Sequence, residues 1–124
     1  MSCLFDSLGE ALNLPGHIIR NDICNYLQTN PYLIKDVRFD NIIEWTNEGN
    51  MNEYIERMRH PSTWGGGTEI KCFVNMTGLN VIVSVQEDRP KYILFSSEDS
   101  TEKRVIVLDW NGSHYTFKES GILE

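Results

Sequence analysis

The sequence has no long hydrophobic run, no closely paired cysteines and no excess of basic residues. No apolar stretch approaches the roughly eighteen residues that a membrane-spanning helix needs. The first residues also lack the basic start and apolar stretch of a signal peptide. Only three cysteines occur, none in a Cys-x-x-Cys pair, which disfavours a disulfide scaffold and a structural zinc site. We therefore expect free thiols, a cytoplasmic protein in a reducing compartment, and no membrane partner.

Basic side chains are outnumbered by acidic ones. Eleven Lys and Arg against eighteen Asp and Glu give a net charge of −7. A basic phosphate-binding stripe is therefore not expected, and nucleic acid is disfavoured as a partner. An acidic surface suits a basic protein partner better. The 124 residues, 40% hydrophobic and 23% charged, are typical of one globular domain over residues 1–124, which we expect to be monomeric.

Apolar residues recur at helical spacing in the first half of the chain. Steps of three and four predict helices over residues 3–12, 18–28, 39–45 and 51–59. Proline and glycine positions separate them, because neither residue favours a helix interior. After Gly65-Gly66-Gly67 we expect a further helix that runs to about Thr77. Thr68 is expected to cap it, and Glu69 to complement its dipole.

The second half changes to a strand pattern. Residues 81–85, 92–95, 105–108 and 114–117 are rich in β-branched and aromatic residues. Mostly short connections separate these runs, which favours antiparallel pairing. The sequence therefore predicts an α+β domain, with helices first and a small, mostly antiparallel sheet after them.

Three side chains are candidates for thiol chemistry. Cys24 and Cys72 lie inside predicted helices and are expected to be small buried side chains. Cys3 precedes an amphipathic helix, where free backbone N–H groups and the helix dipole stabilise a thiolate. The alternative for Cys3 is an ordinary thiol near a chain end. His114 follows the turn Trp110-Asn111-Gly112-Ser113 and could serve Cys3 as a general base.

The ordered motifs resemble a known family. Cys3-Leu4-Phe5 with Ser7-Leu8 resembles the nucleophile segment of the OTU (ovarian tumour) cysteine proteases, whose common pattern is Asp-Gly-Asn-Cys-Leu-Phe-Arg-Ala-Leu. Trp64-Gly65-Gly66 with Glu69-Ile70 is similar to the family's central stretch, and His114-Tyr115 to its terminal histidine with an aromatic neighbour. The resemblance covers nearly the whole chain in the right order.

The resemblance implies a papain-like OTU fold and a deubiquitinase that needs no metal or cofactor. Cys3 would attack the carbonyl after the C-terminal glycines of ubiquitin or a ubiquitin-like protein, with His114 as base and then acid. Backbone N–H groups of Ser2 and Cys3 would stabilise the oxyanion. A narrow channel for the glycine tail would be lined by Trp64, Gly65, Gly66, Trp110, Gly112 and Tyr115. The host cytosol is the expected location for a viral or bacterial member.

Two positions depart from the family pattern. The Asp-Gly-Asn ahead of the cysteine is missing, since only Met1 and Ser2 precede Cys3. Either the segment is trimmed or its loop is minimal. Many members place Asp or Asn two residues after the histidine, where this chain has Thr116. Asn111 and Asp109 are the other candidates for orienting the imidazole, and a dyad without a third member stays open.

The departures leave competing hypotheses. One is a catalytically weak or inactive OTU-like domain that binds ubiquitin without cleaving it. Another is an unrelated α+β interaction domain, in which Cys3 and His114 would lie far apart. A self-processing protease would use the same chemistry as the leading hypothesis.

Overall fold

The computed structural model describes residues 3–30, 32–34, 37–38, 50–98 and 100–123. The described helices are α1 (Cys3–Leu12), α2 (Gly16–Thr29), α4 (Met51–Arg59) and α5 (Gly67–Thr77). The described strands are β1 (Tyr32–Ile34), β2 (Val37–Arg38), β3 (Asn80–Val85), β4 (Lys91–Phe95), β5 (Arg104–Trp110) and β6 (Tyr115–Ile122). The predicted α+β class is confirmed. The helix expected over residues 39–45 lies outside the described residues, and the short β1–β2 pair was not predicted.

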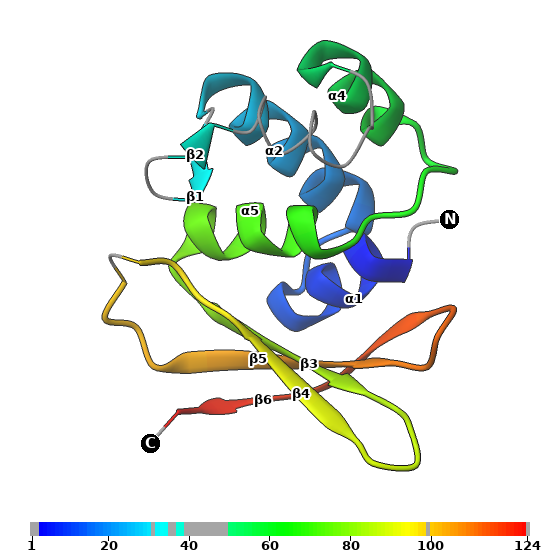
Figure 1. Cartoon of the computed structure of the whole chain (residues 1–124), viewed down its shortest axis with the longest axis vertical. Coiled ribbons are helices and arrows are strands. Elements are labelled where there is room, and N and C mark those ends of the chain that lie inside the picture. Colours follow the sequence, from blue (N-terminus) through cyan, green and yellow to red (C-terminus); the bar gives the residue numbers. More distant parts are fainter. Residues whose placement is uncertain (1–2, 31, 35–36, 39–49, 99, 124) are drawn as a thin grey trace.

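The helices lie over one face of the main sheet (Figure 1). α1 and α5 contact its strands, α2 packs on both of these helices, and α4 packs on α2. Phe5 and Leu8 of α1, Ile23 of α2 and Phe73 of α5 are buried between these elements. Burying one such side chain contributes about 1.5–3 kcal/mol. The core therefore fixes the orientation of α1, which begins at Cys3.

Local signals set the helix ends. The side chain of Asn50 accepts the backbone N–H of Glu53 at 2.9 Å and caps α4. Gly78 ends α5 in the left-handed conformation, with φ of 74°. The predicted cap at Thr68 is wrong, because α5 already begins at Gly67 and Gly66 is its N-cap. Thr68 lies inside the first turn, where its backbone is helical.

The main sheet has the strand order β4-β3-β5-β6. β3–β4 and β5–β6 are antiparallel, as predicted, but the central β3–β5 pair is parallel. A parallel pair requires the chain to return to the starting end of β3 before β5 begins. The antiparallel β4 makes that return, because Phe95 at its end pairs with Val81, and the connection to β5 then leads past the start of β3.

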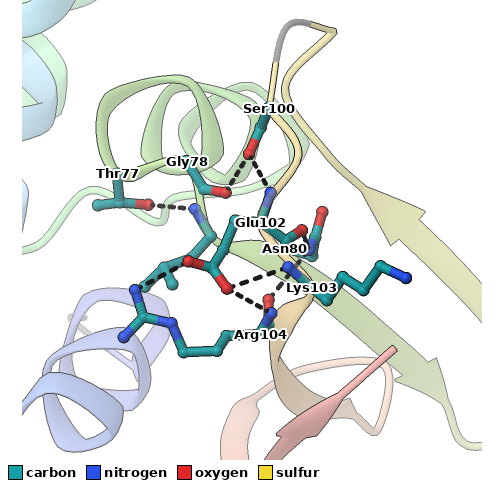
Figure 2. A network of polar contacts seen from close by, with 8 residues as sticks. Thr77, Gly78, Asn80, Ser100, Glu102, Lys103 and Arg104 are labelled. Atoms are coloured by element: carbon teal, nitrogen blue, oxygen red, sulfur yellow. Dashed lines mark hydrogen bonds and ion pairs between the residues drawn. The ribbon is translucent and has the colours of Figure 1, made fainter. Parts of the chain in front are cut away.

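A network of polar contacts holds the residues that lead into β5 at the start of β3 (Figure 2). The buried Asn80 amide donates to the carbonyl oxygens of Glu102, at 2.7 Å, and Arg104, at 3.0 Å. The Ser100 hydroxyl donates to the carbonyl oxygen of Gly78 at 2.7 Å and accepts the N–H of Glu102. These bonds tie the α5–β3 corner to the first residues of β5. The network thereby fixes the register of the parallel pair.

The two buried thiols predict an alkaline loss of stability. Cys24 and Cys72 are fully buried, and burial raises the pKa of both. Folding thus keeps Cys72 protonated while the unfolded chain ionises it above about pH 8.5, so stability falls as pH rises past that value. One pH unit above that value, Cys72 alone lowers the free energy of unfolding by about 1.4 kcal/mol.

Urea unfolding between about pH 7.5 and 9.5 measures this loss. Cys72→Ala should be less stable at neutral pH but should show a shallower decline. A parent protein with a flat profile would contradict the prediction.

Candidate active site

Cys3 occupies the first residue of α1, at the edge of the core. The next two side chains, Leu4 and Phe5, are fully buried and anchor the start of the helix. The Cys3 side chain is only partly buried. The fold thus holds this thiol at a fixed helix start while leaving it accessible to a reactant.

The Ser7 side chain links two parts of the chain: the first turn of α1, which contains Cys3, and Tyr115, the first residue of β6. Its buried Oγ lies 2.6 Å from the carbonyl oxygen of Cys3 and 3.2 Å from that of Tyr115. The single hydroxyl proton is therefore shared between two acceptors from opposite ends of the chain. Because Tyr115 follows His114 directly, this contact brings the histidine's backbone next to the turn of the candidate nucleophile.

The turn between β5 and β6 presents His114. The Oδ1 of Asn111 accepts the backbone N–H groups of Ser113, at 2.9 Å, and His114, at 2.8 Å. Gly112 has φ of 98°, a conformation that side chains rarely adopt. The rings of Trp110 and Tyr115 pack at 4.6 Å across the base of the turn. The turn is therefore braced on both sides, and its exposed histidine projects from a fixed backbone.

The Trp64-Gly65-Gly66 segment lies beside both the start of α1 and His114. The rings of Trp64 and His114 have centroids 6.4 Å apart, and Trp64 is 53% exposed. A Cβ at Gly65 would lie 2.8 Å from the ring of Phe5 and 2.9 Å from Leu4 Cδ2. This segment thus packs on the first turn of α1 on one side and faces His114 on the other.

The surroundings of Tyr115 favour the protonated form of its hydroxyl. Burial raises the pKa of Tyr115, and negative charge on Cys3 and on Glu69 raises it further. Tyr115 therefore stays a neutral phenol, an O–H donor, throughout the physiological pH range.

The two proposed orienting residues differ in their surroundings. The Oδ1 of Asn111 is already used by the turn, so its bond to the imidazole would compete with the backbone donors. Thr116 pairs with Asp109 across β5–β6, and its side chain has no hydrogen bond to another described residue. Asp109 in turn accepts from the amide of Gln86 at 3.2 Å. The imidazole of His114 has no hydrogen-bond partner within the described part of the chain.

The structure brings together most of the residues predicted from sequence. Those gathered around the start of α1 are Cys3, Trp64, Gly65, His114 and Tyr115, with Trp110 packed on Tyr115. Gly66 lies at the start of α5, and Gly112 shapes the β5–β6 turn. Ser2, predicted as an oxyanion donor, lies outside the described residues.

Sequence reasoning missed two contributors, Ser7 and Arg20. Ser7 is one helical turn after Cys3, on the same helix face, which is the available signal for its contact. Arg20 falls at helical spacing with Cys24 and Leu27, so it is a charged residue on an apolar face. Such a position predicts a buried, partnered cation.

Two further features bear on the site. Within the described residues, no group of three or more His, Cys, Asp and Glu side chains is placed to hold a metal ion. None of the described helices has both the length and the apolar character to span a membrane.

Replacing each of the two neighbouring glycines by alanine is expected to change stability by different amounts. Gly65→Ala places a methyl group against Leu4 and Phe5 and should cost about 1–3 kcal/mol by overpacking. Gly66→Ala meets no atom within 4 Å and should cost only the loss of a favoured N-cap residue, at most about 1 kcal/mol. Thermal unfolding of both variants measures the difference, with Gly66→Ala as the matched control. Equal stabilities would show that Gly65 does not pack on α1 as described.

The comparisons with known proteins agree on one family and fold. The family described as OTU-like cysteine protease matches residues 2–117. The sequence matches no curated protein. The OTU domain of OTUD1 is 16% identical, with a TM-score of 0.73 over 95% of this chain and 79% of that one.

Two further solved structures are similar. An ovarian tumor (OTU) domain in complex with ubiquitin is 18% identical, with a TM-score of 0.77 over 98% of this chain and 69% of that one. The viral OTU domain protease from Dera Ghazi Khan virus is 15% identical, with a TM-score of 0.67 over 95% and 76%. These likenesses confirm the fold predicted from the motifs.

Proposed function

The chain belongs to the OTU-like cysteine proteases, and we propose that it hydrolyses the bond after the C-terminal glycines of ubiquitin or a ubiquitin-like protein. The observation that carries the proposal is the Ser7 hydroxyl, which contacts the carbonyl oxygens of both Cys3 and Tyr115. It places the residue next to His114 against the helix turn of the only accessible thiol among the described cysteines. A similar fold has been solved in complex with ubiquitin, which supports the choice of modifier.

The chemistry follows from two side chains. His114 accepts the thiol proton of Cys3 as Sγ attacks the carbonyl carbon of the peptide or isopeptide bond. It then returns the proton to the leaving amine, which departs and leaves a thioester on Cys3. Water, with its proton taken by His114, hydrolyses the thioester and restores the free thiol. Backbone N–H groups of Ser2 and Cys3 are the proposed donors to the oxyanion.

A neutral third member fits this reaction. A partner for the imidazole need only hold its orientation, and some papain-like sites use an asparagine. Asn111 and Thr116 stay the two candidates. Asn111 fixes the backbone of His114 at 2.8 Å, and a bond from its oxygen to the imidazole would compete with that contact.

The substrate tail would lie along the aromatic and glycine residues beside the thiol. Trp64 lies next to His114 and is 53% exposed, so its ring offers an apolar wall. Gly65 and Gly66 present backbone rather than side chains, which suits a tail that itself ends in two glycines. The net charge of −7 suits the basic, tail-bearing face of ubiquitin.

A second candidate function is binding without cleavage. The observation that favours it is the exposed imidazole of His114, which has no hydrogen-bond partner within the described residues. A histidine without a carboxylate partner stabilises its own cation less well. Cleavage and binding are separated by the experiment below. For either function we propose a monomer that works in the cytosol, since its free thiols suit a reducing compartment.

The test uses ubiquitin that carries a C-terminal electrophile. The protein, Cys3→Ala and Cys24→Ala are each mixed with it and examined by intact mass. We expect a one-to-one adduct with the parent and with Cys24→Ala, and none with Cys3→Ala. The same panel run with ubiquitin-like modifiers identifies the preferred one.

No adduct with any modifier, together with ordinary labelling of Cys3 by a small alkylator, would reject the protease. Retained ubiquitin binding in that case would support the binding domain. An adduct that survives in Cys3→Ala would reject Cys3 as the nucleophile.

A further inference from the structure

The segment beside the candidate dyad is held at its first end by a buried arginine. We call residues 63–66 the glycine loop. Arg20 of α2 is 2% exposed, and its Nη2 donates to the carbonyl oxygen of Thr63 at 2.9 Å and of Pro61 at 3.3 Å. Its Nη1 donates to the carbonyl oxygen of Met58 at 2.7 Å. One guanidinium thus binds three carbonyl groups along the chain that leads into the loop.

A buried carboxylate holds the second end of the glycine loop. Glu69 of α5 is 1% exposed, and its Oε1 accepts the backbone N–H of Gly66 at 2.8 Å. Its Oε2 accepts the hydroxyl of Tyr54 at 2.5 Å. The charges of Arg20 and Glu69 also attract, since Glu69 is among the groups that oppose the lowering of the Arg20 pKa by burial. The loop therefore lies between two fixed points.

The residues between these points are the ones that touch the dyad. Gly65 packs on Leu4 and Phe5, which follow Cys3, and Trp64 faces His114. The Arg20 guanidinium also lies 4.2 Å from the centroid of the Phe5 ring, below the start of α1. Both contacts of the loop thus come from residues that lie between the Thr63 carbonyl bound by Arg20 and the Gly66 N–H bound by Glu69.

Buried charges are a costly way to gain stability. Well-packed apolar residues in the place of a buried ion pair are often as stable or more so. A planar guanidinium and a two-oxygen carboxylate are, however, well suited to fix backbone positions, because each binds several groups in a set geometry.

We propose that Arg20 and Glu69 are positioning residues, which hold the glycine loop in register with Cys3 and His114 and so set turnover at each active site. The inference rests on the proposed function. A positioning role differs measurably from a structural one. A merely structural pair would change the fraction of folded protein and not the rate per folded site.

The main test is turnover per titrated site in the full chain. Glu69→Gln keeps the shape of the side chain and one acceptor oxygen but loses the charge and the second acceptor. Sites are counted by the ubiquitin electrophile, and kcat and KM are measured on a ubiquitin C-terminal amide. We expect kcat per site to fall about 10-fold or more, because small misplacements of reacting groups have large effects on rate. Tyr54→Phe removes one bond to Glu69 and should give a smaller loss in the same direction.

Asn80→Ala is the matched control. Asn80 is also buried and makes two hydrogen bonds to backbone carbonyls, but at the starting end of the parallel strands (Figure 2). The dyad lies near the other end of β5, about 20 Å away at the usual rise per strand residue. This variant should lose stability and keep the parental kcat per site.

A second readout needs no activity. With fluorotryptophan in the protein, the Trp64 resonance is assigned from Trp64→Phe and followed on His114→Ala. In the parent background and in Asn80→Ala, His114→Ala should shift this resonance. In the Glu69→Gln background the shift should be largely lost, because Trp64 no longer faces His114.

The outcomes separate the two proposals. Parental kcat per site in Glu69→Gln and Tyr54→Phe, or an undiminished shift of the Trp64 resonance in Glu69→Gln, would overturn the positioning role. A parent protein that cleaves no modifier rejects the proposed function, and the resonance measurement then decides the positioning of Trp64 by itself.

Discussion

Cys3→Ala is expected to reduce hydrolysis of a ubiquitin C-terminal amide to background, a loss on the order of 10⁴-fold or more. No described thiol can replace it, because Cys24 and Cys72 are fully buried. The side chain of Cys3 is partly exposed, and Leu4 and Phe5 anchor the helix start without it. The variant should therefore stay within about 0.5 kcal/mol of the parent in stability.

Steady-state kinetics and thermal unfolding measured on the same preparation test both halves of this prediction. Cys24→Ala provides the opposite pattern: a less stable protein whose kcat per active site is unchanged. Residual turnover in Cys3→Ala above that of buffer would assign the nucleophile elsewhere. A Cys3→Ala protein that fails to fold would give Cys3 a structural role instead.

His114→Ala is expected to lower kcat/KM by about 10²–10⁴-fold, the usual contribution of a general acid–base group. It should also slow the alkylation of Cys3 by a small reagent at neutral pH, because the base that takes the thiol proton is gone. The His114 side chain is exposed, and the turn depends on its backbone N–H rather than its ring. Loss of fold is thus not expected.

His60→Ala is the matched control for this variant. His60 is also exposed, but its ring contacts the Ser62 hydroxyl at the end of α4, at 2.7 Å. Replacing it should leave both kcat/KM and Cys3 alkylation at parental values. If His114→Ala alkylates at the parental rate across pH, the imidazole does not serve Cys3, and the dyad assignment is wrong.

Much of the helical half could be predicted from the sequence because its signals are local. The apolar spacing over residues 3–12 and 51–59 matches α1 and α4. The Asn50 side chain caps the start of α4, and the left-handed backbone of Gly78 ends α5. The site motifs were found by their resemblance, in order along the chain, to those of the OTU family.

The remainder depends on contacts between distant segments. The parallel β3–β5 pair arises because β5 lies beside β3 on the side opposite the antiparallel β4, which no local pattern of apolar residues reports. The occupied Oδ1 of Asn111 depends on the geometry of a single turn. The three carbonyl partners of Arg20 lie 38 to 43 positions further along the chain. The side-chain types of Asn111 and Arg20 alone therefore gave no indication of which backbone groups they bind.

The contact of Ser7 with Tyr115 joins residues 108 positions apart. A contact of that span is among the last to form, because the ends of a long loop must first be brought together. The ribosome releases α1 early and β6 late, and domains generally fold as units during synthesis. Cys3 therefore cannot meet His114 until β6 has emerged and paired with β5. Under the proposed function, the growing chain therefore gains its activity only after β6 has paired with β5.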